Sequence, residues 1–177
     1  MSILDKVKKG DNNAFAELID MYKAPIYKTA KAILKDEDDV CDVLQDVALS
    51  IYKNIKNLKN EKYLKTWIVR ITINKSYDII AKRKLNDEKI AKVKMETNEI
   101  HMGFEKDIIE KTDLEKALDL LDEELKITTV LYYYDDLSVS EISDILNIPK
   151  GTVKSRIFRA REKLYEILSK KEVSINE

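Results

Sequence analysis

Apolar residues recur at intervals of three and four along most of the chain, the spacing of one face of an α-helix. The first half contains three such stretches, residues 3–34, 38–55 and 64–84. Between the second and third stretches, the sequence NIKNLKNEKY is rich in Asn and Lys and predicts a surface loop. Helical spacing resumes at about residue 112 and continues through LEKALDLLDEELKITTVLYYYDD, SVSEISDILN and PKGTVKSRIFRAREKLYEIL. The pattern therefore predicts two groups of helices.

A segment with weaker periodicity separates the two groups. Residues 88–111 contain Gly103 and have no strong helix cap. We interpret them as a flexible linker between two small helical domains, residues 1–87 and 112–177. Only 3 glycines and 2 prolines occur in the 177 residues, which favours long helices over sheets. We therefore expect an all-α fold.

The second domain contains the pattern of a helix-turn-helix. Ser138 and Glu141 have the spacing of a capping box, which predicts the start of a short helix. This helix should stop near Asn147, and Pro149 suits the first turn of the next helix. The next helix should place its apolar residues, Val153, Ile157, Ala160 and Leu164, on a face opposite to Thr152, Ser155, Arg156 and Arg159.

Charge is gathered in blocks, although the formal net charge is only -1. Residues 36–46 carry six acids and no base, whereas residues 82–94 carry six bases and two acids, and residues 150–163 carry six bases and one acid. A charged helix face is often only a solvated surface, and Asp38 and Asp39 could simply favour a helix N-terminus. One-sided positive charge on the second helix of a helix-turn-helix instead favours DNA contact.

Other classes of protein lack the residues that they need. Cys41 is the only cysteine and His101 the only histidine, so we expect no disulfide and no metal site. A Gly-rich phosphate loop and a nucleophile with its base are also missing, so we expect no enzyme, no cofactor and no small-molecule substrate. Trp67 and the tyrosines at 132–134 are interpreted as packing residues. Without an apolar stretch of signal-peptide length, the chain is expected to be soluble and cytoplasmic.

The sequence IPKGTVKSRIFRAREKL resembles region 4.2 of the sigma-70 family, in particular the extracytoplasmic-function (ECF) sigma factors. DEDDVCDVLQDVALSIYKNI resembles region 2.2, and LKTWIVRITINKSYDIIAKRK resembles regions 2.3 and 2.4, in the order that the family has. The resemblance implies an alternative RNA polymerase sigma factor that directs promoter-specific transcription initiation, in a stress or cell-envelope response. A departure is Ala48, which stands where the family more often has an aromatic residue.

The resemblance also implies site residues. The candidates for binding the β′ clamp coiled coil of core polymerase are Asp42, Gln45 and Asp46. The candidates for binding the −10 promoter element are Asn57, Lys59, Asn60, Asn74, Lys82, Arg83 and Lys84. The candidates for binding the −35 element are Lys150, Thr152, Lys154, Ser155, Arg156, Phe158 and Arg159.

The implied partners are core RNA polymerase, through its β′ clamp and β flap, promoter DNA and a membrane-anchored anti-sigma factor. Such an anti-sigma factor would hold the chain at the inner face of the membrane. Two alternatives are a stand-alone helix-turn-helix regulator and a sigma-derived interaction protein without promoter activity. The resemblance of residues 1–85 favours the sigma factor, because a stand-alone regulator needs neither a clamp-binding nor a −10-reading region.

Overall fold

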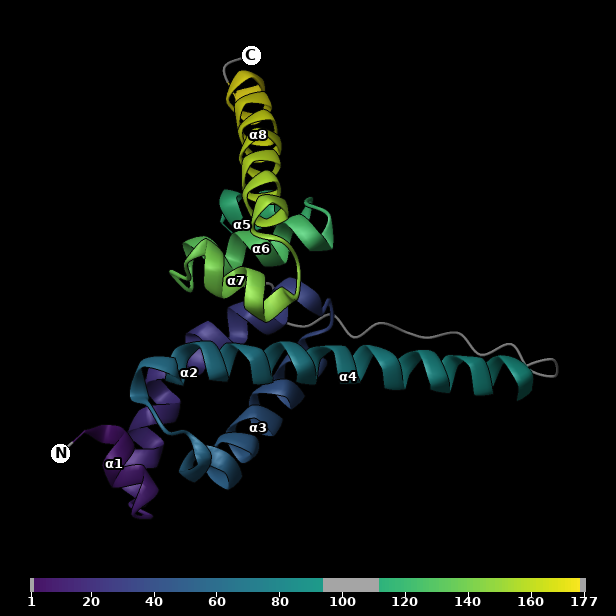
Figure 1. Ribbon diagram of the computed structural model, residues 1–177. Coiled ribbons are helices and arrows are strands. Elements are labelled where there is room, and N and C mark those ends of the chain that lie inside the picture. Colours follow the sequence, from purple (N-terminus) through teal and green to yellow (C-terminus); the bar gives the residue numbers. More distant parts are fainter. Residues whose placement is uncertain (1, 94–111, 176–177) are drawn as a thin grey trace.

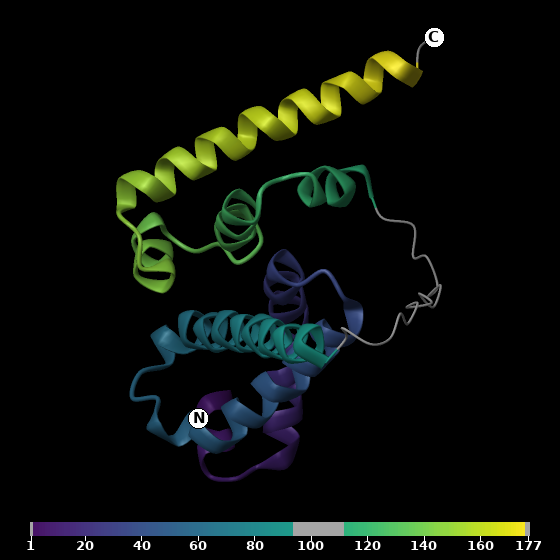
Figure 2. The ribbon, with the colours of Figure 1, turned by 90° about the vertical axis from the view of Figure 1, so that its right-hand side faces the viewer.

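The described residues form an all-helical molecule, as the sequence predicts (Figures 1 and 2). The computed structural model describes residues 2–93 and 112–175, and the side chains of residues 2–85 and 112–169. The first unit contains α1 (Ile3–Lys8), α2 (Asn12–Ile33), α3 (Glu37–Asn54), the short 3-10 helices η1 (Ile55–Asn57) and η2 (Glu61–Tyr63), and α4 (Leu64–Val93). The second unit contains α5 (Asp113–Asp119), α6 (Glu123–Tyr133), α7 (Val139–Leu146) and α8 (Lys150–Ile175).

Polar side chains begin several of these helices. Ser2, Thr112 and Ser138 each form a capping box with the acid three residues later. Gly10 has a φ of 88°, a conformation that favours glycine, and it separates α1 from α2. The periodic stretch predicted over residues 3–34 is therefore two helices. The turn at Gly10 ends the first helix, although the apolar spacing continues across it.

The helix α4 is longer than the sequence predicts. It continues to Val93 and so includes residues 88–93, which the pattern assigned to the linker. Polar residues such as Lys89 and Lys92 are good helix formers even where no apolar stripe marks their helix. The rest of the predicted linker, including Gly103 and His101, lies outside the described residues.

Each unit has apolar packing of its own. In the first unit, Leu18 of α2, Val43 and Ile51 of α3 and Ile68 of α4 are completely buried. In the second unit, a smaller cluster joins α5 and the start of α6 to α8. It consists of Leu118, Leu121, Leu125 and Ala160, with Leu164 partly buried against it.

A third cluster, which we call the shared core, joins the two units. Figures 1 and 2 both show the second unit lying over α2 and α4. The residues of the shared core are Ala32 and Ile33 of α2, Val69 and Ile73 of α4, and Ile127, Val130, Leu131, Leu137, Ile142, Val153 and Ile157 of the second unit. The two units therefore pack directly against each other, an arrangement that the sequence does not predict.

Candidate nucleic-acid interface

The exposed face of the acidic helix α3 carries polar residues at its start and apolar residues toward its end. Asp42 and Gln45 are exposed, and Asp46 is half-buried within 3.8 Å of the Lys75 ammonium on α4. Leu49 and Tyr52 follow Gln45 by one and two turns, and more than half of each side chain is exposed. Sequence reasoning missed these two residues, although an apolar pair on an otherwise polar face is a signal of partner binding.

The start of α3 holds Arg83, one of the predicted DNA contacts. The Arg83 guanidinium donates a hydrogen bond of 2.7 Å to Asp39 and lies 3.6 Å from Asp36. Burial raises the pKa of the Asp39 carboxyl, although Arg83 acts in the opposite direction. The backbone N–H of Asp38, followed by Arg83, lowers the pKa of Asp36. Arg83 thus joins α4 to α3.

The other predicted −10 contacts of this helix and its preceding loop are on the surface. Asn57, Lys59 and Asn60 are exposed in the loop, and Lys82 and Lys84 are exposed on α4. The Asn60 side chain accepts a hydrogen bond of 2.9 Å from the backbone N–H of Lys62, which begins η2. The Lys8 ammonium donates to the backbone oxygen of Leu58 and ties the loop to α1.

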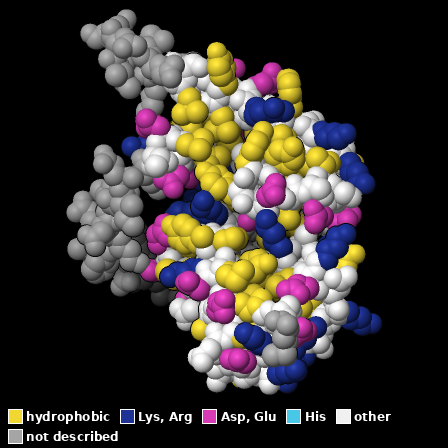
Figure 3. Space-filling view, turned by 90° about the vertical axis from the view of Figure 1, so that its left-hand side faces the viewer, with side chains coloured by type: hydrophobic (Ala, Val, Ile, Leu, Met, Phe, Trp, Pro, Cys, Tyr) yellow, Lys and Arg dark blue, Asp and Glu magenta, His cyan; other side chains and the backbone are white. Residues whose placement is uncertain are grey.

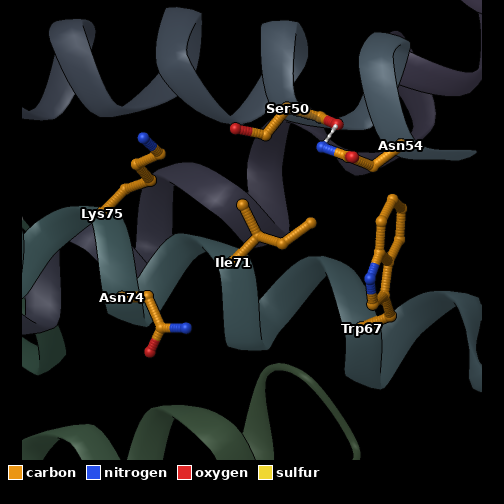
Figure 4. A pocket seen from close by; sticks show the side chains of 6 residues that line it. All are labelled: Ser50, Asn54, Trp67, Ile71, Asn74 and Lys75. Carbon is orange, nitrogen blue, oxygen red and sulfur yellow. Dashed lines mark hydrogen bonds between the residues drawn. The ribbon is translucent and has the colours of Figure 1, made fainter.

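A shallow pocket lies between α3 and α4 beside Asn74 (Figure 4). Its volume is about 260 Å³, below the roughly 300–1,000 Å³ typical of small-molecule sites. Its lining residues are Ser50, Asn54, Trp67, Ile71, Asn74 and Lys75. Trp67 packs against the core of the first unit, as predicted, and also lines this pocket. The pocket therefore offers an aromatic ring, amides and a cation, the groups that recognise a nucleobase and its phosphate.

The helix-turn-helix forms as predicted. Its first helix, α7, ends at Leu146, and Asn147 adopts a left-handed conformation with a φ of 53°. The Ser143 hydroxyl donates to the backbone oxygen of Ile148 at 2.6 Å, which fixes the turn. Val153, Ile157 and Ala160 of α8 are at most 5% exposed, and this confirms the predicted apolar face.

The outward face of α8 carries most of the predicted −35 contacts. Lys150, Lys154, Ser155, Phe158 and Arg159 are exposed, and Thr152 is half-buried. The Ser155 hydroxyl donates to the backbone oxygen of Thr152 at 2.9 Å. A basic face with one large exposed ring is therefore available on this helix.

Arg156 differs from the other predicted contacts. Its side chain is only 13% exposed, and its Nη2 donates to Glu124 Oε2 of α6 at 2.6 Å. Its Nε is buried without a hydrogen-bond partner among the described residues. The sequence places Arg156 on the polar face of its helix, but the fold turns its guanidinium toward α6.

Figure 3 shows one side of the molecule, where Lys and Arg side chains recur along the right-hand edge and hydrophobic side chains form clusters over both units. Among the described residues, His, Cys, Asp and Glu side chains form no group of three that could hold a metal ion. None of the described helices has the length and apolarity to cross a membrane.

The fold and the site define a class of protein: a helical, two-unit protein with a helix-turn-helix in the second unit and a small pocket between α3 and α4 in the first. Comparison with known families agrees with this class. Residues 18–85 match Sigma-70 region 2, and residues 111–164 match Sigma-70, region 4. The chain belongs to the ECF sigma factors of the sigma-70 family, which direct RNA polymerase to promoters.

Two similar proteins illustrate the relationship. The chain is 34% identical over 172 residues to the ECF RNA polymerase sigma factor SigW of Bacillus subtilis, covering 91% of this chain and 92% of SigW. It is 30% identical over 174 residues to the ECF RNA polymerase sigma-E factor of Escherichia coli K12, covering 90% of this chain and 89% of that protein.

Solved structures share the fold. The sigma factor RpoE of Bartonella quintana, in complex with the anti-sigma factor NepR, matches with a TM-score of 0.69 and 24% identity, covering 88% of this chain and 96% of that one. CnrH, in complex with the cytosolic domain of CnrY, matches with a TM-score of 0.64 and 23% identity, covering 94% of this chain and 95% of that one.

Proposed function

We propose that α3 binds core RNA polymerase, that the loop at residues 55–63 and the pocket on α4 bind the −10 element, and that α8 reads the −35 element. The observation that carries this proposal is the pocket beside Asn74. An Asn side chain donates and accepts at once, which suits a base edge, and Trp67 supplies a stacking surface. The Lys75 ammonium in the same pocket can neutralise a phosphate.

The pocket and the proposed polymerase-binding face share a helix. Ser50 and Asn54 line the pocket from the end of α3, and Asp46 of α3 lies beside Lys75. A change in the position of α3 on the polymerase therefore reaches the pocket within one or two helical turns. This proximity supports a link between polymerase binding through α3 and promoter recognition at the pocket.

A sigma factor of this kind also needs contacts with core polymerase and a regulator. We infer binding to the β′ clamp coiled coil through Asp42, Gln45 and Asp46, and to the β flap through the second unit. The chain acts as an initiation factor without a reaction of its own, in the cytoplasm, where the polymerase and its promoters are. The complexes of RpoE with NepR and of CnrH with CnrY support control by an anti-sigma factor, and we propose a membrane-anchored one. A stress or cell-envelope response fits such control.

An electrophoretic mobility-shift titration at fixed salt tests the function. The probe is a duplex selected from a random-sequence pool by the chain together with core polymerase. We expect sequence-specific binding by the chain with core polymerase and weak binding by either component alone, because the net charge of -1 gives little long-range attraction to DNA. Tight, specific binding by the chain alone would support the stand-alone regulator instead.

Size-exclusion co-elution of the chain with core polymerase tests the polymerase-binding face. We expect Gln45→Ala to weaken the binding of the chain to core polymerase about fivefold, the loss of roughly one hydrogen bond at an interface. Asp20→Asn, an exposed change on α2, is the matched control and should leave co-elution with core polymerase unchanged. Equal binding of the two variants to core polymerase would contradict a contact between Gln45 and the polymerase.

A further inference from the structure

Arg156 is placed differently from the exposed residues of the same helix. An arginine that reads a guanine edge uses two of its donors side by side, free to enter the major groove. Only 13% of the Arg156 side chain is exposed, and its Nη2 is bound to Glu124. Its Nε is buried without a hydrogen-bond partner among the described residues. Two of its three nitrogens are therefore out of reach of a base edge in this arrangement.

A second ion pair lies two turns further along α8. The Lys163 ammonium donates to Asp122 Oδ2 at 2.6 Å, and Asp122 is the N-cap residue of α6, two positions before Glu124. The hydrogen bond from Lys163 lowers the pKa of the Asp122 carboxyl, so this acid stays charged at neutral pH. Two turns of helix are about 10 Å long. The start of α6 thus holds α8 at two separated points, Arg156 and Lys163.

A small apolar contact lies between the two ion pairs. Arg156, Ala160 and Lys163 share one side of α8, because they are spaced by four and by three residues. Ala160 is 1% exposed and packs in one cluster with Leu121 and Leu125 of the second unit. The short alanine side chain lets the two helices approach closely at this point. A helix held at one such point can pivot, whereas the two ion pairs on either side of it resist rotation.

We propose that Arg156 is a positioning residue for −35 recognition: its pair with Glu124, together with the Lys163 pair, fixes the angle at which α8 meets DNA. This inference rests on the proposed function, because that function assigns −35 reading to α8. Without the Glu124 pair, α8 can pivot about Ala160, and ordering it on the DNA then costs binding free energy. Base reading is left to exposed residues of this helix: Lys154, Ser155, Phe158 and Arg159.

The sign of the effect of Glu124→Gln separates positioning from direct reading. If Arg156 were a DNA contact restrained by Glu124, releasing it and removing a negative charge would strengthen binding. We instead expect E124Q to bind the selected duplex about fivefold more weakly with core polymerase, the upper end for a partly exposed ion pair. Glu162→Gln removes the same charge from an exposed position on α8 and should bind no more weakly than the native chain. Tighter binding by E124Q, or binding equal to that of E162Q, would overturn the proposal.

Two further readouts exclude a general loss of folding. On a duplex whose −35 part is scrambled, E124Q and the native chain should bind equally, because the proposed −10 contacts lie in the first unit. On the intact duplex, R156E should bind more weakly than E124Q, because two like charges then face each other. The swap of E124R with R156E should recover most of the binding that R156E loses. An equal loss on the scrambled duplex, or no recovery by the swap, would overturn the proposal.

Arg159 supplies the matched comparison within α8. R159Q should erase the preference for one base pair of the −35 part, measured with duplexes that carry single base changes. R156Q should weaken binding to all of these duplexes by the same factor and keep each preference. A preference lost in R156Q would make Arg156 a base-reading residue and overturn the proposal. No dependence on the −35 part in the native chain with core polymerase would instead overturn the proposed function.

Discussion

At the residue scale, side chains with the same predicted role have different surroundings in the structure. Arg156 and Arg159 share the predicted polar face of α8, yet Arg159 is exposed and Arg156 is bound to Glu124, 32 residues earlier in the chain. The apolar face of the same helix was predictable, because its spacing is local. The direction of a long polar side chain was not, because it depends on a neighbour that folding brings from another helix.

Asp135 should make the docking of the units depend on pH. Burial raises the pKa of its carboxyl from 3.8 to about 6, against the opposing effects of the Thr29 hydrogen bond and of the positive charges of Lys65 and Lys28. The docked state therefore holds this proton more tightly than an open state does. This contribution favours docking fully below a pH of about 4 and is lost as the pH rises through about 6, a change on the order of 3 kcal/mol. The fraction of chains with the two units docked should therefore be smaller at pH 7.5 than at pH 5.

The variant Asp135→Asn tests this dependence, with docking measured by energy transfer between a dye on the exposed Cys41 and a second dye on Tyr165→Cys. Because its amide does not titrate, the fraction of docked chains should stay constant over this pH range. Asp136→Asn is the matched control, because Asp136 is the exposed neighbour and its φ of 49° is one that Asn tolerates. The control should retain the pH response of the native chain. A constant docked fraction in both variants, or in neither, would assign the response to another group.

At the element scale, the second unit was largely predictable because its signals are local. The capping box of Ser138, the end of α7 at Leu146 and the apolar face of α8 all depend on residues within a few positions of each other. The division at Gly10 was not found, since the apolar spacing continues through the turn. The extent of α4 was not found either, because its last turns lack an apolar stripe.

Removing the cap of α7 should weaken the helix-turn-helix. In Ser138→Ala, the backbone N–H of Glu141 loses the side-chain oxygen that accepts it at 3.3 Å. We expect the free energy of unfolding to fall by about 1 kcal/mol in urea titrations followed by circular dichroism. Ser140→Ala, the same change at an exposed position two residues later, should lower it by less than about 0.5 kcal/mol. An equal loss in both variants would contradict a capping role for Ser138.

At the scale of the whole molecule, two helical units were predictable and their contact was not. Periodicity shows that α2 and α4 have apolar faces, but not that part of each face is covered by the second unit. Ala32, Ile33, Val69 and Ile73 read as ordinary core residues of the first unit, yet they belong to the shared core. The same holds for the candidate site. Its residues could be predicted from the motifs, whereas the pocket between α3 and α4 could be found only from the structure, because it forms where two helices pack together.

The shared core should couple the stability of the two units. Ile73→Ala removes a buried side chain of α4 that packs against the second unit, and should lower the free energy of unfolding by about 2–5 kcal/mol. Hydrogen exchange should then become faster in α6 and α7 as well as in α4. Ile55→Ala, a buried change within the core of the first unit, is the control and should leave α6 and α7 protected. Unchanged exchange in α6 and α7 of Ile73→Ala would contradict the coupling.

The composition of the shared core has a consequence for solubility. An opened chain presents Ile33, Val69, Ile73 and Leu131 to water at once, and a contiguous apolar surface of this kind promotes aggregation. Variants that open the units without supplying polymerase should therefore be less soluble at high concentration than the native chain. In the cell, the same surface would make a permanently open chain a substrate for chaperones and proteases, so the docking of the two units also protects the chain from degradation.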